Sequence, residues 1–171
     1  DTYNQLLAEQ PDHVEGLIGR AAMHSAAGRY QSAITDLTRS LRIRPEDDLA
    51  LNNRGFAYSE LGNYNRALAD YTASLAYLPD DPITLANRGS AYYDRGDYQL
   101  AVDDLTRAIE LDDTDHVAFN NRGLAYKALG QYERALEDYN TSIALQPEDQ
   151  EGIERYNRGI LYYDTDRYDL A

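Results

Sequence analysis

The chain has 171 residues and no cysteine, which excludes disulfides, thiolate metal sites and cysteine nucleophiles. Thirty acidic residues against 16 lysines and arginines give a formal net charge of −14, which leaves no basic face for nucleic acid or for an anionic membrane surface. No apolar run approaches the roughly 20 residues that span a bilayer, and the N-terminus lacks a signal-peptide pattern. We therefore expect a soluble protein, in the cytoplasm, with neither a nucleic-acid nor a membrane partner.

The string Asn-Arg-Gly, followed three residues later by Tyr, occurs four times, and its first three copies start 34 residues apart. A fixed period of this length is typical of one small supersecondary unit that is stacked repeatedly. We expect a single array over residues 1–171, with a fifth repeat that is truncated and displaced by two extra residues. Because the chain begins at Asp1 and not at Met, it is expected to be an excised or processed segment. The expected parts are the end of a preceding repeat (1–13), the whole repeats 14–47, 48–81, 82–115 and 116–149, and the truncated repeat 150–171.

Within each repeat, apolar residues recur at helical spacing in two successive stretches, which predicts an all-α fold of helical hairpins. In the second repeat the first stretch runs from Leu51 to Leu61 and the second from Ala67 to Leu78. A glycine suited to the left-handed conformation stands at each turn, and Asp166 replaces it in the last repeat. The turn glycines are Gly28, Gly62, Gly96 and Gly130.

The connectors between repeats are rich in Pro and Asp, because Pro stops one helix and Asp caps the next. A calcium site is the alternative interpretation of these carboxylates. None of the connectors has the alternating ligands, the Gly and the distal Glu of an EF-hand loop. We therefore expect helix caps, and no metal or other cofactor.

A second set of glycines lies inside the first helix of each hairpin, where Gly costs roughly 1 kcal/mol relative to Ala. This repeated cost predicts that the two helices approach closely at Gly55, Gly89, Gly123 and Gly159. The expected contact is the small residue at the start of the second helix. These small residues are Ala67, Ala101, Ala135 and Ala171.

An arginine precedes each of these glycines, or Ala21 in the first repeat, and in the four whole repeats an aspartate follows the arginine by 16 residues. We predict ion pairs that link the two helices of each hairpin; the alternative is that the arginines bind carboxylates of a ligand. The predicted pairs are Arg20 with Asp36, Arg54 with Asp70, Arg88 with Asp104 and Arg122 with Asp138.

The chain resembles the tetratricopeptide repeat proteins over all 171 residues. The resemblance rests on recurring small residues, aromatics and a proline at the family's spacing. In the second repeat these are Gly55, Ala67, Ser74, Tyr58, Tyr64, Tyr71 and Pro79. It implies a right-handed superhelical solenoid of antiparallel helix pairs, in which the first helices line a concave groove.

The resemblance also implies that the exposed stripe of each first helix faces a peptide-binding groove. The Asn of each repeat would then form a ladder that satisfies the N–H and C=O groups of an extended peptide. The alternative is that each Asn bonds to the adjacent repeat. Apolar residues of the stripe, such as Phe56, Leu124 and Ile160, would form side-chain pockets or be buried by a neighbouring repeat. The candidate groove residues are Asn52, Asn53, Phe56, Asn87, Ser90, Tyr93, Asn120, Asn121, Leu124, Lys127 and Asn157.

Co-chaperone members of the family grip a C-terminal carboxylate with Lys, Arg and Asn of the first helices. Here apolar or uncharged residues occupy the cationic places, so chaperone-tail recognition is not expected. These residues are Leu49, Asn52, Ile83, Ala86 and Val117. The stripe carries Glu60, Asp94 and Asp164 against Lys127 alone, which favours neutral or basic peptides.

The predicted function is a protein–protein interaction scaffold that binds an extended or helical peptide segment in the groove. The alternative is a structural spacer, or a segment that self-associates head to tail through uncapped ends near Tyr3 and Leu6 and over residues 162–171. An enzyme is not expected, because the three histidines occupy non-equivalent places and no glycine-rich phosphate loop is present. His24 is expected to fill a packing position that holds Tyr in other repeats.

Overall fold

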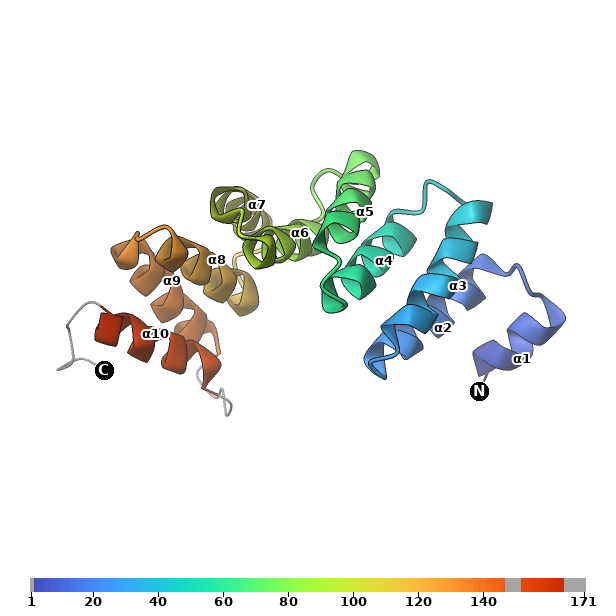
Figure 1. Cartoon of the computed structure of the whole chain (residues 1–171), viewed down its shortest axis with the longest axis horizontal. Helices are drawn as coiled ribbons and strands as arrows, with labels where there is room; N and C mark the ends of the chain where they lie inside the picture. The colour runs from blue at the N-terminus through green and yellow to red at the C-terminus, as the bar shows by residue number, and fades with distance from the viewer. Residues whose placement is uncertain (1, 147–151, 165–171) are drawn as a thin grey trace. The chain divides into compact units, whose positions relative to one another are not determined.

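The computed structural model describes residues 2–146 and 152–164, and within these ranges every regular element is an α-helix (Figure 1). The predicted all-α class is therefore confirmed. The helices are α1 (Thr2–Glu9), α2 (Val14–Ala26), α3 (Tyr30–Ile43), α4 (Asp48–Glu60), α5 (Tyr64–Tyr77), α6 (Pro82–Arg95), α7 (Tyr98–Leu111), α8 (His116–Ala128), α9 (Tyr132–Leu145) and α10 (Ile153–Asp164).

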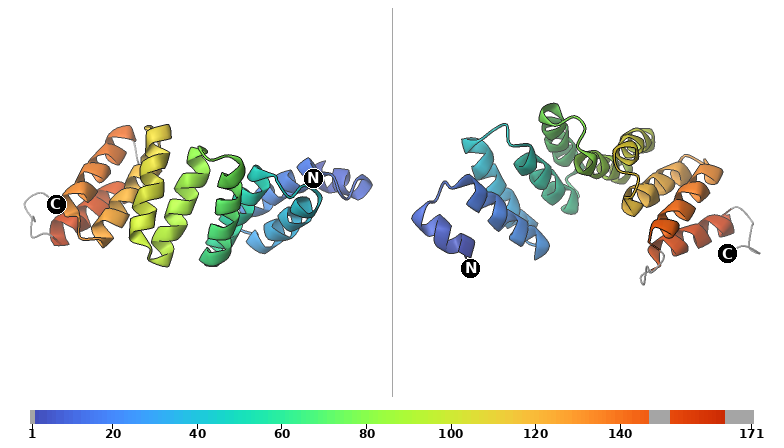
Figure 2. Two further views of the ribbon diagram at one scale, coloured as in Figure 1. Left: turned by 90° about the horizontal axis from the view of Figure 1, so that it is seen from above. Right: turned by 180° about the vertical axis from the view of Figure 1, so that it is seen from behind.

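The chain forms two compact units, an N-terminal unit of residues 1–79 and a C-terminal unit of residues 80–171. In the N-terminal unit α2 packs against α3 and α4 against α5, while α1 lies against α2. In the C-terminal unit α6 pairs with α7 and α8 with α9, while α10 packs on α9. The paired helices can be followed in Figure 2. Each whole repeat is thus one helical hairpin.

Side chains of the connectors begin the first helices. The Asp47 carboxylate accepts a hydrogen bond from the Ala50 amide at 2.9 Å, and Asp81 and Asp115 cap α6 and α8 in the same way. In the first repeat, the ring of His13 takes this role. The predicted caps are confirmed for these helices, whereas Pro147 lies outside the described residues.

The turn between the two helices of a hairpin requires a left-handed residue. The four predicted turn glycines have φ between 69° and 94°, where a Cβ would strain the backbone. Asp166, which occupies this place in the last repeat, lies outside the described residues. The tight turns explain why only three residues separate most paired helices, such as α4 and α5.

Gly55, Gly89 and Gly123 make room for a different neighbour from the one predicted, whereas no atom of the described residues lies within 4 Å of a Cβ added at Gly159. A Cβ on Gly55 would lie 2.7 Å from the ring of Tyr71, and a Cβ on Gly89 would lie 2.7 Å from Cγ of Leu105. The predicted alanine contributes only its backbone: the carbonyl oxygen of Ala101 would lie 3.3 Å from the same added atom. The glycine therefore accommodates a large side chain 16 residues later. The predicted contact with Ala171 lies outside the described residues.

Tyrosine or leucine fills this space in alternate repeats. Tyr71 and Tyr139 are 1% and 0% exposed, and Leu37 and Leu105 are both fully buried. Burial raises the pKa of both phenols far above the usual value for tyrosine. The same position thus forms the centre of every hairpin, because it lies between the two helices opposite the small residue.

Candidate functional site

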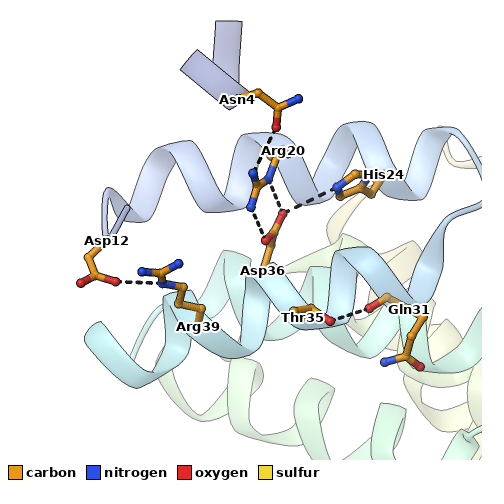
Figure 3. A network of polar contacts seen from close by, with 8 residues as sticks. All are labelled: Asn4, Asp12, Arg20, His24, Gln31, Thr35, Asp36 and Arg39. Atoms are coloured by element: carbon orange, nitrogen blue, oxygen red, sulfur yellow. Dashed lines mark hydrogen bonds and ion pairs between the residues drawn. The ribbon is translucent and has the colours of Figure 1, made fainter. Parts of the chain in front are cut away.

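Each of the four predicted arginine–aspartate pairs is present. Nε and one terminal nitrogen of Arg20 donate to the two carboxylate oxygens of Asp36, both at 2.7 Å (Figure 3). This bond to Asp36 raises the pKa of the Arg20 guanidinium. The other three pairs have the same two-point geometry, with distances of 2.6–2.8 Å. These arginines hold the hairpins together, so the alternative role as ligand-binding groups is not supported.

The same arginines have a second partner that the sequence analysis missed. The remaining terminal nitrogen of Arg20 donates to Asn4 at 3.1 Å (Figure 3), and that of Arg122 donates to Thr106 at 3.2 Å. These acceptors belong to the second helix of the preceding repeat. Arg20, Arg54 and Arg122 therefore each link three helices. In the sequence, the polar residue that stands 16 positions before each arginine could have indicated this second contact.

In the C-terminal unit, Asn121 and Asn157 bond to neighbouring repeats. Nδ2 of Asn121 donates to the hydroxyl of Ser90 at 2.9 Å, and this hydroxyl donates to the carbonyl of Ala86. Nδ2 of Asn157 donates to Oδ1 of Asn120 at 2.9 Å. Asn121 and Asn157 therefore follow the alternative interpretation, in which each asparagine bonds to the adjacent repeat. Since Leu124 stands where Asn157 would meet a serine like Ser90, the amide of Asn157 bonds one turn away instead.

Asn120 differs from the expected exposed stripe, because it is buried, with 8% of its surface exposed. Its carbonyl oxygen is occupied by Asn157. Leu124 is half-buried against the cluster formed by Ala135, Tyr139 and Leu161, as the burial alternative describes. Asn120 and Leu124, which belong to the predicted stripe, therefore take part in the packing between α8 and α10.

In the N-terminal unit the same stripe is more open. Phe56 is 38% exposed, and its ring meets the ring of Tyr30 edge-on at 6.2 Å. The hydroxyl of Tyr30 donates to Glu60 at 2.7 Å, a bond that raises the pKa of Tyr30. Asn53 is half-buried and its amide forms no hydrogen bond within the described residues. This stripe thus combines a polar amide, an aromatic ring and a carboxylate.

Four candidate residues remain, and all of them are only partly buried. Tyr93 is half-buried, with its ring 5.6 Å from that of Tyr98, and burial raises the pKa of its phenol. Asn52, Asn87 and Lys127 are also half-buried. None of these four is withdrawn into the core.

An exposed aliphatic side chain stands at the start of four first helices, two residues after the cap in three of them. We call these residues the apolar row: Leu49, Ile83, Val117 and Ile153, which are 53%, 64%, 50% and 51% exposed. In the C-terminal unit they lie on α6, α8 and α10, where successive first helices are neighbours. Leu49, Ile83 and Val117 recur every 34 residues in the sequence, and Ile153 follows after 36, yet these residues were not among the predicted groove residues.

No group of three or more potential metal-ligating side chains is found in the described part of the chain. The histidines are separate: His13 caps α2, His24 lies 3.8 Å from Asp36, and His116 lies 3.3 Å from Glu154. Among the described residues, no helix has both the length and the apolar character needed to cross a membrane.

Comparisons with known proteins agree with this architecture. Models of the tetratricopeptide repeat match residues 1–48, 37–69, 58–120 and 116–149. A search of curated protein sequences gave no match.

Among solved structures, MamA from Desulfovibrio magneticus RS-1 is 23% identical, with a TM-score of 0.83 over 93% of this chain and 89% of that one. YrrB, described as a tetratricopeptide repeat protein with an unusual peptide-binding site, is 19% identical, with a TM-score of 0.76 over 97% and 84%. The first such domain of Spaghetti (RPAP3), bound to an HSP90 peptide, is 28% identical, with a TM-score of 0.65 over 70% and 93%. Because the repeat models together span residues 1–149 and the solved structures share the fold, the chain belongs to the tetratricopeptide repeat family.

Proposed function

We propose that this protein is a non-enzymatic interaction scaffold that binds an extended or helical peptide segment along its first helices. The observation that carries the proposal is the apolar row, which repeats an exposed aliphatic side chain at the start of successive first helices. Further contacts come from the residues predicted from the sequence other than Asn120 and Leu124, which are taken up by the packing between α8 and α10. These are Asn52, Asn53, Phe56, Asn87, Ser90, Tyr93, Asn121, Lys127 and Asn157.

The apolar row supports binding because exposed aliphatic groups gain free energy when a partner covers them. Full burial of a Val, Leu or Ile side chain contributes about 1.5–3 kcal/mol. Single exposed apolar residues are normal on a protein surface, but a regular series on neighbouring helices is typical of a contact surface. Ile83, Val117 and Ile153 form such a series on α6, α8 and α10.

The asparagines support recognition of a peptide backbone. A carboxamide has two donor hydrogens and an acceptor oxygen with two lone pairs, so Asn121, which donates one bond to Ser90 and accepts one from Asn120, keeps capacity for a ligand. The amide of Asn53 keeps its full capacity within the described residues. Backbone groups of an extended segment present both donors and acceptors, and an amide matches either one.

The charge of the stripe favours a neutral or basic segment. Glu60 and Asp94 lie on the first helices with Lys127 as the opposing charge, and the chain as a whole carries −14. The peptide complex of the Spaghetti domain and the peptide-binding site of YrrB support a peptide as the class of partner. A carboxylate clamp is not part of the proposal, because Leu49, Ile83 and Val117 occupy cationic places of that clamp.

A displayed library of random peptides, selected on the intact chain, tests the proposal, with affinities of single peptides measured by titration calorimetry. Ile83→Ser with Val117→Ser is expected to weaken binding at least about tenfold, since two apolar contacts are lost. The matched control is Leu100→Ser on α7, a second-helix residue of comparable exposure, which should leave binding unchanged. Loss of binding in the control alone would place the site on the second helices and refute the proposal.

Self-association is a second candidate, favoured by Met23. This side chain is 52% exposed, whereas the equivalent residues of the next three repeats, Ala57, Ala91 and Ala125, are fully buried. The face of α2 that carries Met23 would suit stacking of another hairpin. Sedimentation velocity at several concentrations distinguishes the two candidates, because a constant sedimentation coefficient would exclude self-association.

A further inference from the structure

The second helix of the first repeat is basic in an acidic chain. Residues 29–44, which contain α3, hold four arginines and one aspartate, a net charge of +3. The equivalent residues 97–112 of the third repeat, which contain α7, hold one arginine and five acidic residues, a net charge of −4. This difference lies on the second helices, outside the proposed peptide-binding stripe.

A pocket of about 560 Å³ opens beside α3 within the N-terminal unit, and we call it the α3 pocket. Figure 3 shows two arginines at its wall, Arg20 from α2 and Arg39 from α3, each with a carboxylate partner. Exposed Ile43 gives the pocket an apolar edge. The residues that matter here are Asp12, Arg20, Asp36, Arg39, Arg42 and Ile43.

In the third repeat, the arginine equivalent to Arg39 binds a second carboxylate from its own helix. Arg39 donates to Asp12 at 2.8 Å, and the equivalent Arg107 donates to Asp80 at 2.9 Å. Arg107 has a further partner, because a second guanidinium nitrogen donates to Glu110 at 2.9 Å. Arg42 stands in the place of Glu110 in the first repeat.

This exchange reverses the charge beside the arginine, and of the other pocket residues Thr35 is replaced by Asp103 and Ile43 by Leu111 in the third repeat. Arg39 has no carboxylate partner besides Asp12 within the described residues, and its side chain is 43% exposed. Arg42 has no ion-pair partner there and is also exposed. Two guanidinium groups therefore line the pocket where the third repeat holds a carboxylate of its own.

We propose that the α3 pocket binds a carboxylate from an acidic segment of a partner protein, in the place that Glu110 takes beside Arg107. The terminal nitrogens of Arg39 and the guanidinium of Arg42 would donate charge-assisted hydrogen bonds to it. Ile43 would contact an aliphatic neighbour in the same segment. A carboxylate ligand is favoured over other anions because Arg39 already binds the carboxylate of Asp12, and its equivalent Arg107 binds the two carboxylates of Asp80 and Glu110.

The test uses the peptide acetyl-Leu-Glu-Leu-Glu-amide and its twin with glutamine in place of glutamate. Binding to the intact chain is measured by titration calorimetry and by NMR at low ionic strength. The glutamate peptide should bind at least about tenfold more tightly than the glutamine peptide, because charge-assisted bonds are lost in the twin. Equal affinity of the two peptides would overturn the proposal, and inorganic phosphate binding more tightly than the glutamate peptide would overturn the choice of carboxylate.

Three variants locate the site, and two of them, Arg42→Glu and Glu110→Arg, are reciprocal. Arg42→Glu should recreate the closed arrangement of the third repeat and abolish binding, and Arg42→Gln should weaken it. Glu110→Arg should open an equivalent site beside Arg107 and raise the stoichiometry from one peptide to two. Unchanged binding in Arg42→Glu would refute the proposal, as would unchanged stoichiometry in Glu110→Arg. Circular dichroism confirms that each variant remains helical.

A second copy of this acidic chain is the competing occupant. Sedimentation velocity of the wild type and of Arg42→Glu distinguishes a second copy of the chain from a separate partner protein. Concentration-dependent association that disappears in Arg42→Glu would assign the pocket to a second copy and overturn a separate partner. A sedimentation coefficient independent of concentration, together with peptide binding, supports the partner.

Discussion

In the C-terminal unit, Asn121 donates a hydrogen bond to Ser90 of the preceding repeat, whereas in the N-terminal unit the equivalent Asn53 forms none within the described residues. The residue at the place of Ser90 in that unit is Ala22, which has no side-chain acceptor. The same asparagine thus closes a contact in one unit and offers its amide to solvent in the other. A repeated residue has one role only where its neighbour repeats as well.

The contacts inside the hairpins do not vary in this way. Arg54 pairs with Asp70 in the N-terminal unit, and Arg122 pairs with Asp138 in the C-terminal unit with nearly identical distances. Both arginines also reach a threonine of the preceding second helix. The two units therefore share their internal contacts and differ in what their first helices present, which is where we place binding.

The largest loss of stability is expected where the two helices of a hairpin cross at a glycine. Gly89→Leu would place several atoms where Cγ of Leu105 would already lie 2.7 Å from a single added Cβ. We expect a loss of about 4 kcal/mol or more in the free energy of unfolding, because overpacking at this crossing forces the helices apart. Urea denaturation followed by circular dichroism measures it. Ala69→Leu on the exposed face of α5 is the control; equal stability of both variants would contradict the role of the crossing.

The contribution of each arginine–aspartate pair to the free energy of unfolding should increase with the burial of its two side chains. Side-chain exposure is 15% for Arg122 and 6% for Asp138, against 48% and 66% for Arg107 and Asp80. Arg122→Met should cost about 3 kcal/mol because it leaves a buried carboxylate without its partner. Arg107→Met should cost only about 0–1 kcal/mol, since that pair is open to solvent. Double-mutant cycles with Asp138→Asn and Asp80→Asn measure both couplings, and equal values would show that burial does not decide the strength.

The difference between the two asparagines should appear as a smaller effect. Asn121→Ala removes the bond to Ser90 and should lower the free energy of unfolding by about 1 kcal/mol. Asn53→Ala removes no such bond and should leave stability nearly unchanged. In peptide binding the order should be reversed, with the larger loss of affinity in Asn53→Ala. Thermal denaturation and calorimetry are the two measurements, and identical effects of both variants would remove the distinction between the units.

The helical hairpins, their caps, their turns and the arginine–aspartate pairs could be predicted from the sequence. These features depend on residues at fixed offsets, and a 34-residue period displays every offset several times. The cap of Asp47 and the left-handed Gly62 need only a few neighbouring residues, and the 16-residue offset from Arg54 to Asp70 recurs in each whole repeat.

The candidate site could be predicted only in outline, because its contacts depend on pairs that do not repeat. The small residue at Gly55 indicated close packing, but it did not reveal that the ring of Tyr71 fills the space. The burial of Asn120 depends on Asn157, which stands two residues out of register and meets Leu124 in place of a serine. The α3 pocket depends on Arg42 and Asp12, which are distant in sequence and come together only in the fold.

The two partners of Arg54 have a consequence for how such arrays change length. Arg54 finds Asp70 16 residues later and Thr38 16 residues earlier, and both offsets are shorter than one 34-residue repeat. Duplication or loss of one whole repeat would therefore give every arginine both kinds of partner again at the new junction. Arg158 shows that an insertion is also absorbed, because its acceptor Asn140 lies 18 residues earlier instead of 16. The array can thus gain or lose hairpins as interchangeable modules, and the number of repeats is free to follow the length of the segment that we propose it binds.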